Sequence, residues 1–277
     1  MRRMRDKAGF TLIELVVVII LLGVVGIMTT QFMGSGVQLY RDTQEQQSAL
    51  DTTRFALERL SREVAGAHPA SLRLPRGDGS CIEFIPVVGA GGYLGLARDH
   101  ASLELIDSGA DYWQPQKSAL APGRRLSINS QLASELYGAL PAASGSVAVL
   151  ASFTPSAATA TVTGAATVTP GSFVWAADSR ARRYYVLNES GPVAWCLRGG
   201  QLYRYSLYVG SGAWSWDWSA GFPASGSLMA ERLSASSRFS LVPASLNHNV
   251  QLDLSLRVLV EGGELVLNRR MQVNYVP

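Results

Sequence analysis

Two features near the N-terminus could take part in chemistry: the peptide bond between Gly9 and Phe10, and the carboxylate of Glu14. Residues 10–28 (FTLIELVVVIILLGVVGIM) are apolar except for Thr11 and Glu14, and such a run can span a bilayer as a helix. A carboxylate there costs on the order of 2.5–3.5 kcal/mol at the bilayer centre, and less near a helix end. Glu14 therefore predicts a cationic partner; the alternative is a carboxylate that reaches the lipid headgroups.

The apolar run follows a short basic leader, residues 1–9. Four of the 24 basic residues and one of the 21 acidic residues lie in it, which leaves 20 of each sign in the rest of the chain. The positive-inside rule keeps the leader in the cytoplasm and sends the C-terminal part across the membrane. An ordinary secretory signal has its small-residue cleavage site after the apolar run. Here Gly9 precedes the run, so cleavage would leave the helix on the mature chain and create a new α-amino group on Phe10.

Residues 7–15 (KAGFTLIEL) resemble the processing signature of type IV pilins and type II secretion pseudopilins. The resemblance implies cleavage between Gly9 and Phe10 and N-methylation of Phe10 by a prepilin peptidase. It also implies that Glu14 guides docking into a filament of other major and minor pilins. The expected location is the inner membrane, with a single pass and the head in the periplasm, and afterwards a pilus or pseudopilus filament.

The helix that positions these residues should continue well beyond the membrane. Leu50, Leu57, Leu60 and Val64 recur at helical spacing, with charged residues between them. Pro69 disfavours helix at the residue before it and predicts the end. We expect a leader over residues 1–9, a transmembrane half over 10–33, an amphipathic half over 34–68 and a globular β-rich head over 69–277. The predicted class is α+β, with the helix packed on a mainly antiparallel head.

The last strands of the head have the clearest pattern. Apolar residues alternate through residues 250–258, as in a half-buried strand. The glycine pair at 262–263 predicts a two-residue turn, which would set Val258 opposite Leu267 and Leu254 opposite Met271. Weaker strands are expected at 147–150 and 159–168, although this uncharged stretch is also consistent with a linker. The segment 89–92 (GAGG) reads as a turn.

The two cysteines predict a disulfide. A second hairpin is expected over residues 193–208, turning at the glycine pair 199–200 and placing Cys196 opposite Tyr203. Residues 81–85 form another expected strand. An even pair of cysteines in a periplasmic domain is typical of a disulfide, which would join Cys81 to Cys196; the alternative is two buried free thiols.

Three tryptophans at alternate positions, Trp214, Trp216 and Trp218, would line one face of a strand. Such a surface could hold a sugar or a partner protein, but core or subunit packing is the more usual role of tryptophan.

Composition and spacing indicate no enzymatic chemistry. The three histidines lack metal-ligand spacing, and no acid, base and nucleophile set is recognisable. We therefore expect no catalytic residue, no metal and no cofactor. The charge beyond the leader is balanced, so the sequence of the head shows no basic stripe of the kind that binds nucleic acid, and we expect no nucleic-acid partner.

The head resembles a narrower family more loosely. The early cysteine strand, the hairpin AWCLRGGQLYRY and the ending MQVNYVP are similar to MshO-type minor pilins of the mannose-sensitive haemagglutinin (MSHA) pilus. The J-type minor pseudopilin of type II secretion is the close alternative. Two other classes stay open, a pilus-tip adhesin and a membrane-anchored enzyme.

Overall fold

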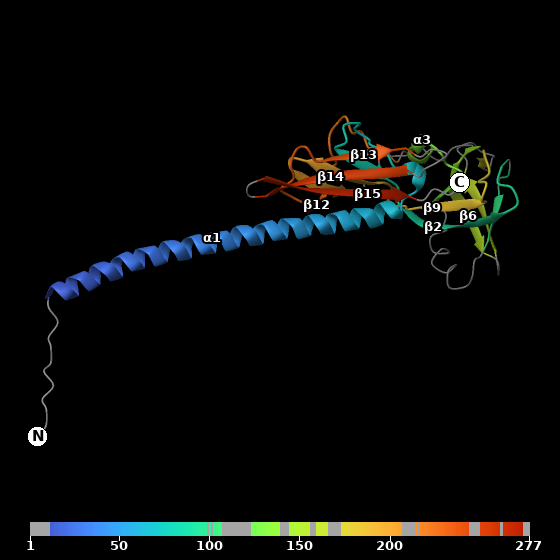
Figure 1. Cartoon of the computed structure of the whole chain (residues 1–277). Helices are drawn as coiled ribbons and strands as arrows, with labels where there is room; N and C mark the ends of the chain where they lie inside the picture. The colour runs from blue at the N-terminus through green and yellow to red at the C-terminus, as the bar shows by residue number, and fades with distance from the viewer. Residues whose placement is uncertain are drawn as a thin grey trace, which may run out of the picture. The chain divides into compact units, whose positions relative to one another are not determined.

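The structure, a computed structural model of the chain, describes residues 12–98, 100, 102–106, 123–138, 144–155, 159–165, 173–206, 214, 216–243, 250–260 and 263–273. The chain divides into two compact units, Met1–Ser48 and Ala49–Pro277. Figure 1 traces the elements from the blue helix α1 to the red strands β14 and β15. A long N-terminal helix and mainly antiparallel sheets make the fold class α+β, as predicted.

The described elements are α1 (Leu12–Ala65), the 3-10 turn η1 (Pro69–Ser71), β1 (Cys81–Phe84), β2 (Val87–Leu94), β3 (Ser102–Ile106), β4 (Arg125–Ser127), α3 (Ala133–Tyr137), β5 (Ser144–Gly145), β6 (Val147–Pro155), β7 (Thr159–Ala165), β8 (Val174–Trp175), β9 (Arg183–Leu187), β10 (Val193–Arg198), β11 (Gln201–Tyr205), β12 (Ser227–Ala230), β13 (Arg238–Val242), β14 (Val250–Val260) and β15 (Gly263–Val273).

The helix ends three residues before the predicted limit of residue 68. It stops at Ala65, and Pro69 begins the short turn η1, for which His68 is the N-cap. In the second unit, one face of α1 is buried through Ala56, Leu60 and Val64. This face packs on the sheets β1-β10-β11-β12 and β13-β14-β15 in one hydrophobic core. The amphipathic pattern in the sequence therefore identified the face of the helix that is buried.

The hairpin β10–β11 has the predicted register, with Cys196 opposite Tyr203 and Trp195 opposite Arg204. Its two-residue turn is Gly199-Gly200, both with positive φ (58° and 76°). Two consecutive positive φ values are what a type I′ turn requires, and glycine adopts them without a Cβ clash.

The hairpin β14–β15 forms, but its predicted register is wrong by two residues. Val258 lies opposite Leu265, and Leu254 opposite Arg269. Val260 pairs with Gly263, so the intervening residues are 261 and 262. A shift of two keeps every side chain on its expected face, which is why burial alone could not reveal it.

A closed six-stranded barrel lies between β1 and β10 in the chain, in the order β2-β3-β7-β6-β4-β9. It has its own core of described side chains, including Tyr93, Leu126, Trp175 and Val186. The predicted strand at 147–150 lies in β6, and the predicted strand at 159–168 coincides with β7 as far as Ala165, since residues 166–168 lie outside the described part of the chain. The predicted turn at 89–92 is wrong because these residues lie within β2. A Cβ on Gly91 would stand 2.7 Å from the Tyr184 hydroxyl, so glycine here permits close packing inside a strand.

Candidate functional site

The N-terminal part of α1 carries Glu14 in its first turn, while Gly9 and Phe10 lie outside the described residues. Around Glu14 the helix is apolar and its side chains are exposed, with Leu12 at 81% and Ile20 at 60%. Among the described residues, α1 alone is long and apolar enough to cross a membrane. The position near the positive end of the helix dipole favours the Glu14 carboxylate.

The hydroxyls of two threonines in the membrane-spanning half of the helix form hydrogen bonds within the helix. The Thr29 hydroxyl donates to the Val25 carbonyl at 2.7 Å, and the Thr30 hydroxyl donates to the Ile27 carbonyl at 2.9 Å. Hydroxyls bonded to the preceding turn need no water. This segment therefore suits a lipid environment.

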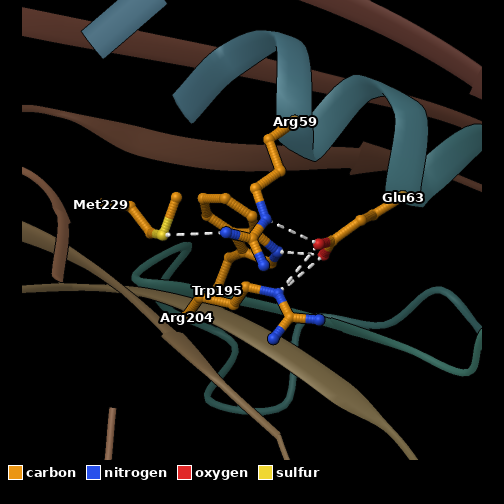
Figure 2. A network of polar contacts seen from close by, with 5 residues as sticks. All are labelled: Arg59, Glu63, Trp195, Arg204 and Met229. Atoms are coloured by element: carbon orange, nitrogen blue, oxygen red, sulfur yellow. Dashed lines mark hydrogen bonds and ion pairs between the residues drawn. The ribbon is translucent and has the colours of Figure 1, made fainter. Parts of the chain in front are cut away.

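In the second unit, α1 is joined to the head by a polar cluster that we call the seam: Arg59, Glu63, Trp195, Arg204 and Met229 (Figure 2). The Glu63 carboxylate accepts hydrogen bonds from Arg204 Nε at 2.9 and 3.0 Å and from Trp195 Nε1 at 3.0 Å. Arg59 Nε, one turn earlier on the helix, donates to Glu63 Oε1 at 3.1 Å.

Burial makes the seam more than a surface ion pair. The side chains of Glu63 and Arg204 are only 20% and 19% exposed, and Trp195 is fully buried. Charge-assisted hydrogen bonds are roughly twice as strong as neutral ones, and a buried charge that loses its partner is costly. The seam therefore fixes the rotation and position of this part of α1 on the hairpin β10–β11.

Sequence reasoning missed the seam, although a signal was present. Glu63 lies between Leu60 and Val64 on the helix face that is otherwise apolar. A charge on a buried face requires a partner of opposite sign. Arg204, opposite Trp195 in the correctly predicted hairpin, was the available cation.

Cys81 and Cys196 form a disulfide, the pair that the sequence predicts. They face each other across the paired strands β1 and β10, and both are fully buried. Tyr205 and Trp218 pack around them. The disulfide therefore links the first strand of the head to the hairpin that carries Arg204.

The predicted tryptophan strip is not formed. Described residues 214 and 216–226 contain no strand, and Trp214 and Trp218 are buried at 8% and 7% exposure in different clusters. Arg125 lies over the Trp214 ring, with Cζ 3.8 Å from the centroid. Trp216 is half-buried and donates from Nε1 to the Gly221 carbonyl at 3.0 Å. Trp216 packs in the same cluster as Trp218 and Trp214 packs in another, so the three tryptophans do not share one face.

His68 and Ser127 resemble a base and a nucleophile, but their surroundings are those of a structural contact. His68 Nδ1 accepts from the Ala70 amide at 3.3 Å, so Nε2 carries the proton and lies 3.1 Å from Ser127 Oγ. The two side chains are 1% and 0% exposed, which leaves no approach for a substrate. Burial lowers the pKa of His68 to about 3, so the imidazole is neutral.

A second set of contacts lies close to His68 and joins α3 to the segment from η1 to β1. Arg73 Nε donates to the buried Glu83 carboxylate at 2.6 Å, and its guanidinium lies 3.6 Å from the centroid of the Tyr137 ring. The Tyr137 hydroxyl donates to the Ser71 carbonyl at 2.8 Å. Burial raises the pKa of Tyr137 well above its usual value. Together with the hydrogen bond between His68 and Ser127, these contacts hold α3 and β4 against η1 and β1.

No group of three or more His, Cys, Asp or Glu side chains within the described ranges is arranged to hold a metal ion. The arrangement that the structure does show supports attachment and rigidity. An exposed apolar helix carries Glu14, and its buried continuation is held on the head by the ion pairs of the seam and by core packing. Within the head, the disulfide joins β1 to β10.

Comparison with known proteins adds one finding about the N-terminus. Residues 4–30 match the family model of the prokaryotic N-terminal methylation motif. No curated protein and no solved structure matches the chain. The match includes Gly9, Phe10 and Glu14, implies processing by a prepilin peptidase, and leaves the head unassigned. The chain therefore carries a type IV pilin-like signal joined to a membrane-anchoring helix.

Proposed function

We propose that this chain is a minor pilin-type structural subunit, cleaved between Gly9 and Phe10 and assembled into a filament. The observation that carries the proposal is the methylation motif at residues 4–30. It overlaps the start of the only described helix able to span a membrane, with Glu14 in the first turn. The head would lie in the periplasm, because the leader is basic.

The proposed mechanism is assembly. The apolar half of α1 moves from lipid to a filament core of similar polarity, so the transfer costs little. Glu14 pairs with the α-amino group of Phe10 on a neighbouring subunit and thereby selects the register. The seam and the disulfide then transmit that register to the head, since Glu63 fixes the second part of α1 on β11.

For the system, we propose an MSHA-like type IV pilus, in which this subunit primes or caps the filament. The hairpin AWCLRGGQLYRY, with Cys196 bonded to Cys81, supports this choice. A J-type pseudopilin of a type II secretion system is the alternative. Deletion distinguishes them: loss of surface pili with intact secretion supports the pilus, and the reverse supports the pseudopilus.

We also propose that the chain has no catalytic role. The arrangement closest to a catalytic pair, His68–Ser127, is buried and lacks a carboxylate on Nδ1, which instead accepts from Ala70. A tip adhesin that uses the tryptophans loses its support because Trp214 and Trp218 are buried.

The decisive experiment is the intact mass of membrane-extracted protein, made with and without a prepilin peptidase. Loss of Met1–Gly9 with gain of one methyl group, only when the peptidase is present, is the expected result. The matched control is Gly9→Leu, which should leave the chain uncut. An uncut wild-type chain in the presence of active peptidase, or a cut after Met28, would overturn the proposal.

A further inference from the structure

The disulfide is packed against a loop, residues 216–222, that lies in neither a strand nor a helix. Three aromatic side chains of this loop belong to, or pack against, the cluster that contains the disulfide: Trp216, Trp218 and Phe222. Trp218 is 7% exposed, and Cys81 and Cys196 are fully buried. A thiol reduces a disulfide by attacking one of its sulfur atoms, so the reaction depends on access to that atom. The aromatic side chains of the loop therefore help to keep a reductant from the bond.

Several hydrogen bonds of this loop are internal. Trp216 Nε1 donates to the Gly221 carbonyl at 3.0 Å. The Asp217 carboxylate accepts from the Ser219 amide at 3.0 Å, and the Asp217 carbonyl accepts from the Ala220 amide at 3.2 Å. None of the described strands pairs with the loop. The loop can therefore move away from the cluster with its own bonds intact and without breaking a β-ladder. Elements of this kind are the ones that open locally while the rest of a protein stays folded.

Two arginines from the strands that the disulfide joins contact the loop. Arg76, which precedes β1, donates from Nη1 to the Trp218 carbonyl at 2.9 Å, and its Cζ lies 5.0 Å from the centroid of the Phe222 ring. Arg198, at the end of β10, has its Cζ 5.2 Å from the same centroid. A guanidinium within about 6 Å of a ring centroid is attracted to the ring. Arg76 combines this attraction with a hydrogen bond, and its side chain is only 29% exposed. It is therefore the stronger of the two contacts.

We propose that residues 216–222 form a cap that opens as a unit while the sheets stay folded, and that Arg76 is the latch that holds the cap closed. With the cap open, a thiolate of a dithiol attacks one sulfur, forms a mixed disulfide and releases the other cysteine as a thiolate. The second thiolate of the dithiol then closes a disulfide within the reductant and releases the first cysteine. Two electrons pass to the protein, and the two thiol protons end on the cysteines. The cap does not depend on the proposed function.

The rate of reduction by dithiothreitol tests the cap in the full-length chain in detergent. The chain has only two cysteines, so every thiol that appears comes from this bond. Acid quenching, alkylation with a maleimide and intact mass count these thiols over time. Arg76→Ala should raise the rate about tenfold, the lower end for a lost hydrogen bond with a charged donor, because Arg76 is partly exposed. Urea below the unfolding transition should change the wild-type rate little, since local opening exposes little surface.

Glu63→Ala is the control that separates the cap from the stability of the whole head. Glu63 bonds to Trp195 and Arg204, on the face of the hairpin opposite to Cys196, because neighbouring residues of a strand point to opposite faces. This variant removes the seam and leaves the contacts of the cap, so we expect an unchanged rate of reduction. Three outcomes would each overturn the proposal: a wild-type rate that rises with urea as steeply as global unfolding, an Arg76→Ala rate equal to wild type, or an equal acceleration by Glu63→Ala.

Discussion

Glu63 on α1 and Arg204 on β11, separated by 141 positions in the sequence, lie 2.9 Å apart in a partly buried ion pair. Trp195 donates to the same carboxylate. Glu63→Ala would leave the Arg204 charge and the Trp195 Nε1–H without this acceptor. We expect the free energy of unfolding to fall by about 2–3 kcal/mol. Urea unfolding in detergent, followed by tryptophan fluorescence, measures the change. Glu58→Ala, exposed on the same helix, is the control; an equal loss there would refute the role of the seam.

Glu14 provides the test of assembly. Glu14→Val removes the carboxylate proposed to pair with the Phe10 amino group, while it keeps the helix apolar. We expect normal membrane levels and cleavage but loss of incorporation into filaments, measured by immunoblot of sheared filaments against membranes. Glu14→Asp keeps the charge and should retain part of the incorporation. Full incorporation of Glu14→Val at unchanged protein level would remove the basis of the mechanism.

The disulfide should contribute strongly to stability. It closes a loop across a sequence separation of 115, and removing a native disulfide of this kind typically costs about 2–5 kcal/mol. Replacing both cysteines by alanine should lower the free energy of unfolding by that amount, measured by urea unfolding at an unchanged m value. Chemical reduction of the wild-type chain should reproduce the loss, and reductant should not alter the double variant. A double variant as stable as the oxidised wild type would contradict this prediction.

Acid should destabilise the head through His68. Its pKa is about 3 in the folded chain, against an ordinary value of 6.5, so the unfolded chain binds the proton more readily. The stability due to the neutral imidazole is complete above pH 6.5 and is lost as pH falls toward 3, by about 1.4 kcal/mol per unit. Unfolding measured from pH 7 to pH 4 should show this slope. His68→Asn should flatten it, whereas His100→Asn, at an exposed position, should not.

Gly226 is required by close packing and not by backbone conformation. A Cβ at this position would stand 2.5 Å from Cε1 of Tyr205, a buried ring that stacks on Phe222. Overpacking of this kind costs about 1–3 kcal/mol, so Gly226→Ala should lower the melting temperature. Gly263→Ala, which meets no atom within 4 Å, should leave it nearly unchanged. Equal melting temperatures for the two variants would show that the Tyr205 ring moves aside.

Local patterns in the sequence predict the long helix, the β10–β11 hairpin and the pairing of the cysteines. In the C-terminal hairpin they left two registers that bury the same face. The cross-strand charges distinguish them, since the observed register places Asp253 opposite Arg270. The predicted register would have placed Asp253 opposite Gln272. Pairing of opposite charges across the two strands could therefore have identified the correct register, whereas alternation of apolar residues could not.

The barrel and the tryptophan segment show where local patterns fail. Closure of the barrel depends on pairing between strands distant in the chain, such as β2 with β9, and its glycine-rich strand β2 has the composition of a turn. Trp214 and Trp218 lie four positions apart in the sequence but enter different clusters. That Glu63 accepts hydrogen bonds from Arg204 and Trp195 could not be predicted without knowing which strands pack on α1. Each of these is a tertiary contact with no counterpart in residue periodicity.

The position of the disulfide relative to the barrel has a mechanical consequence. The barrel lies in the chain between β1 and β10, and Cys81–Cys196 joins those two strands directly. The barrel is therefore contained in a covalently closed loop. Tension applied between α1 and the C-terminal strands passes through the sulfur–sulfur bond and by-passes the loop. In the proposed filament, load would strain the strands β1 and β10 while the barrel stays unstretched.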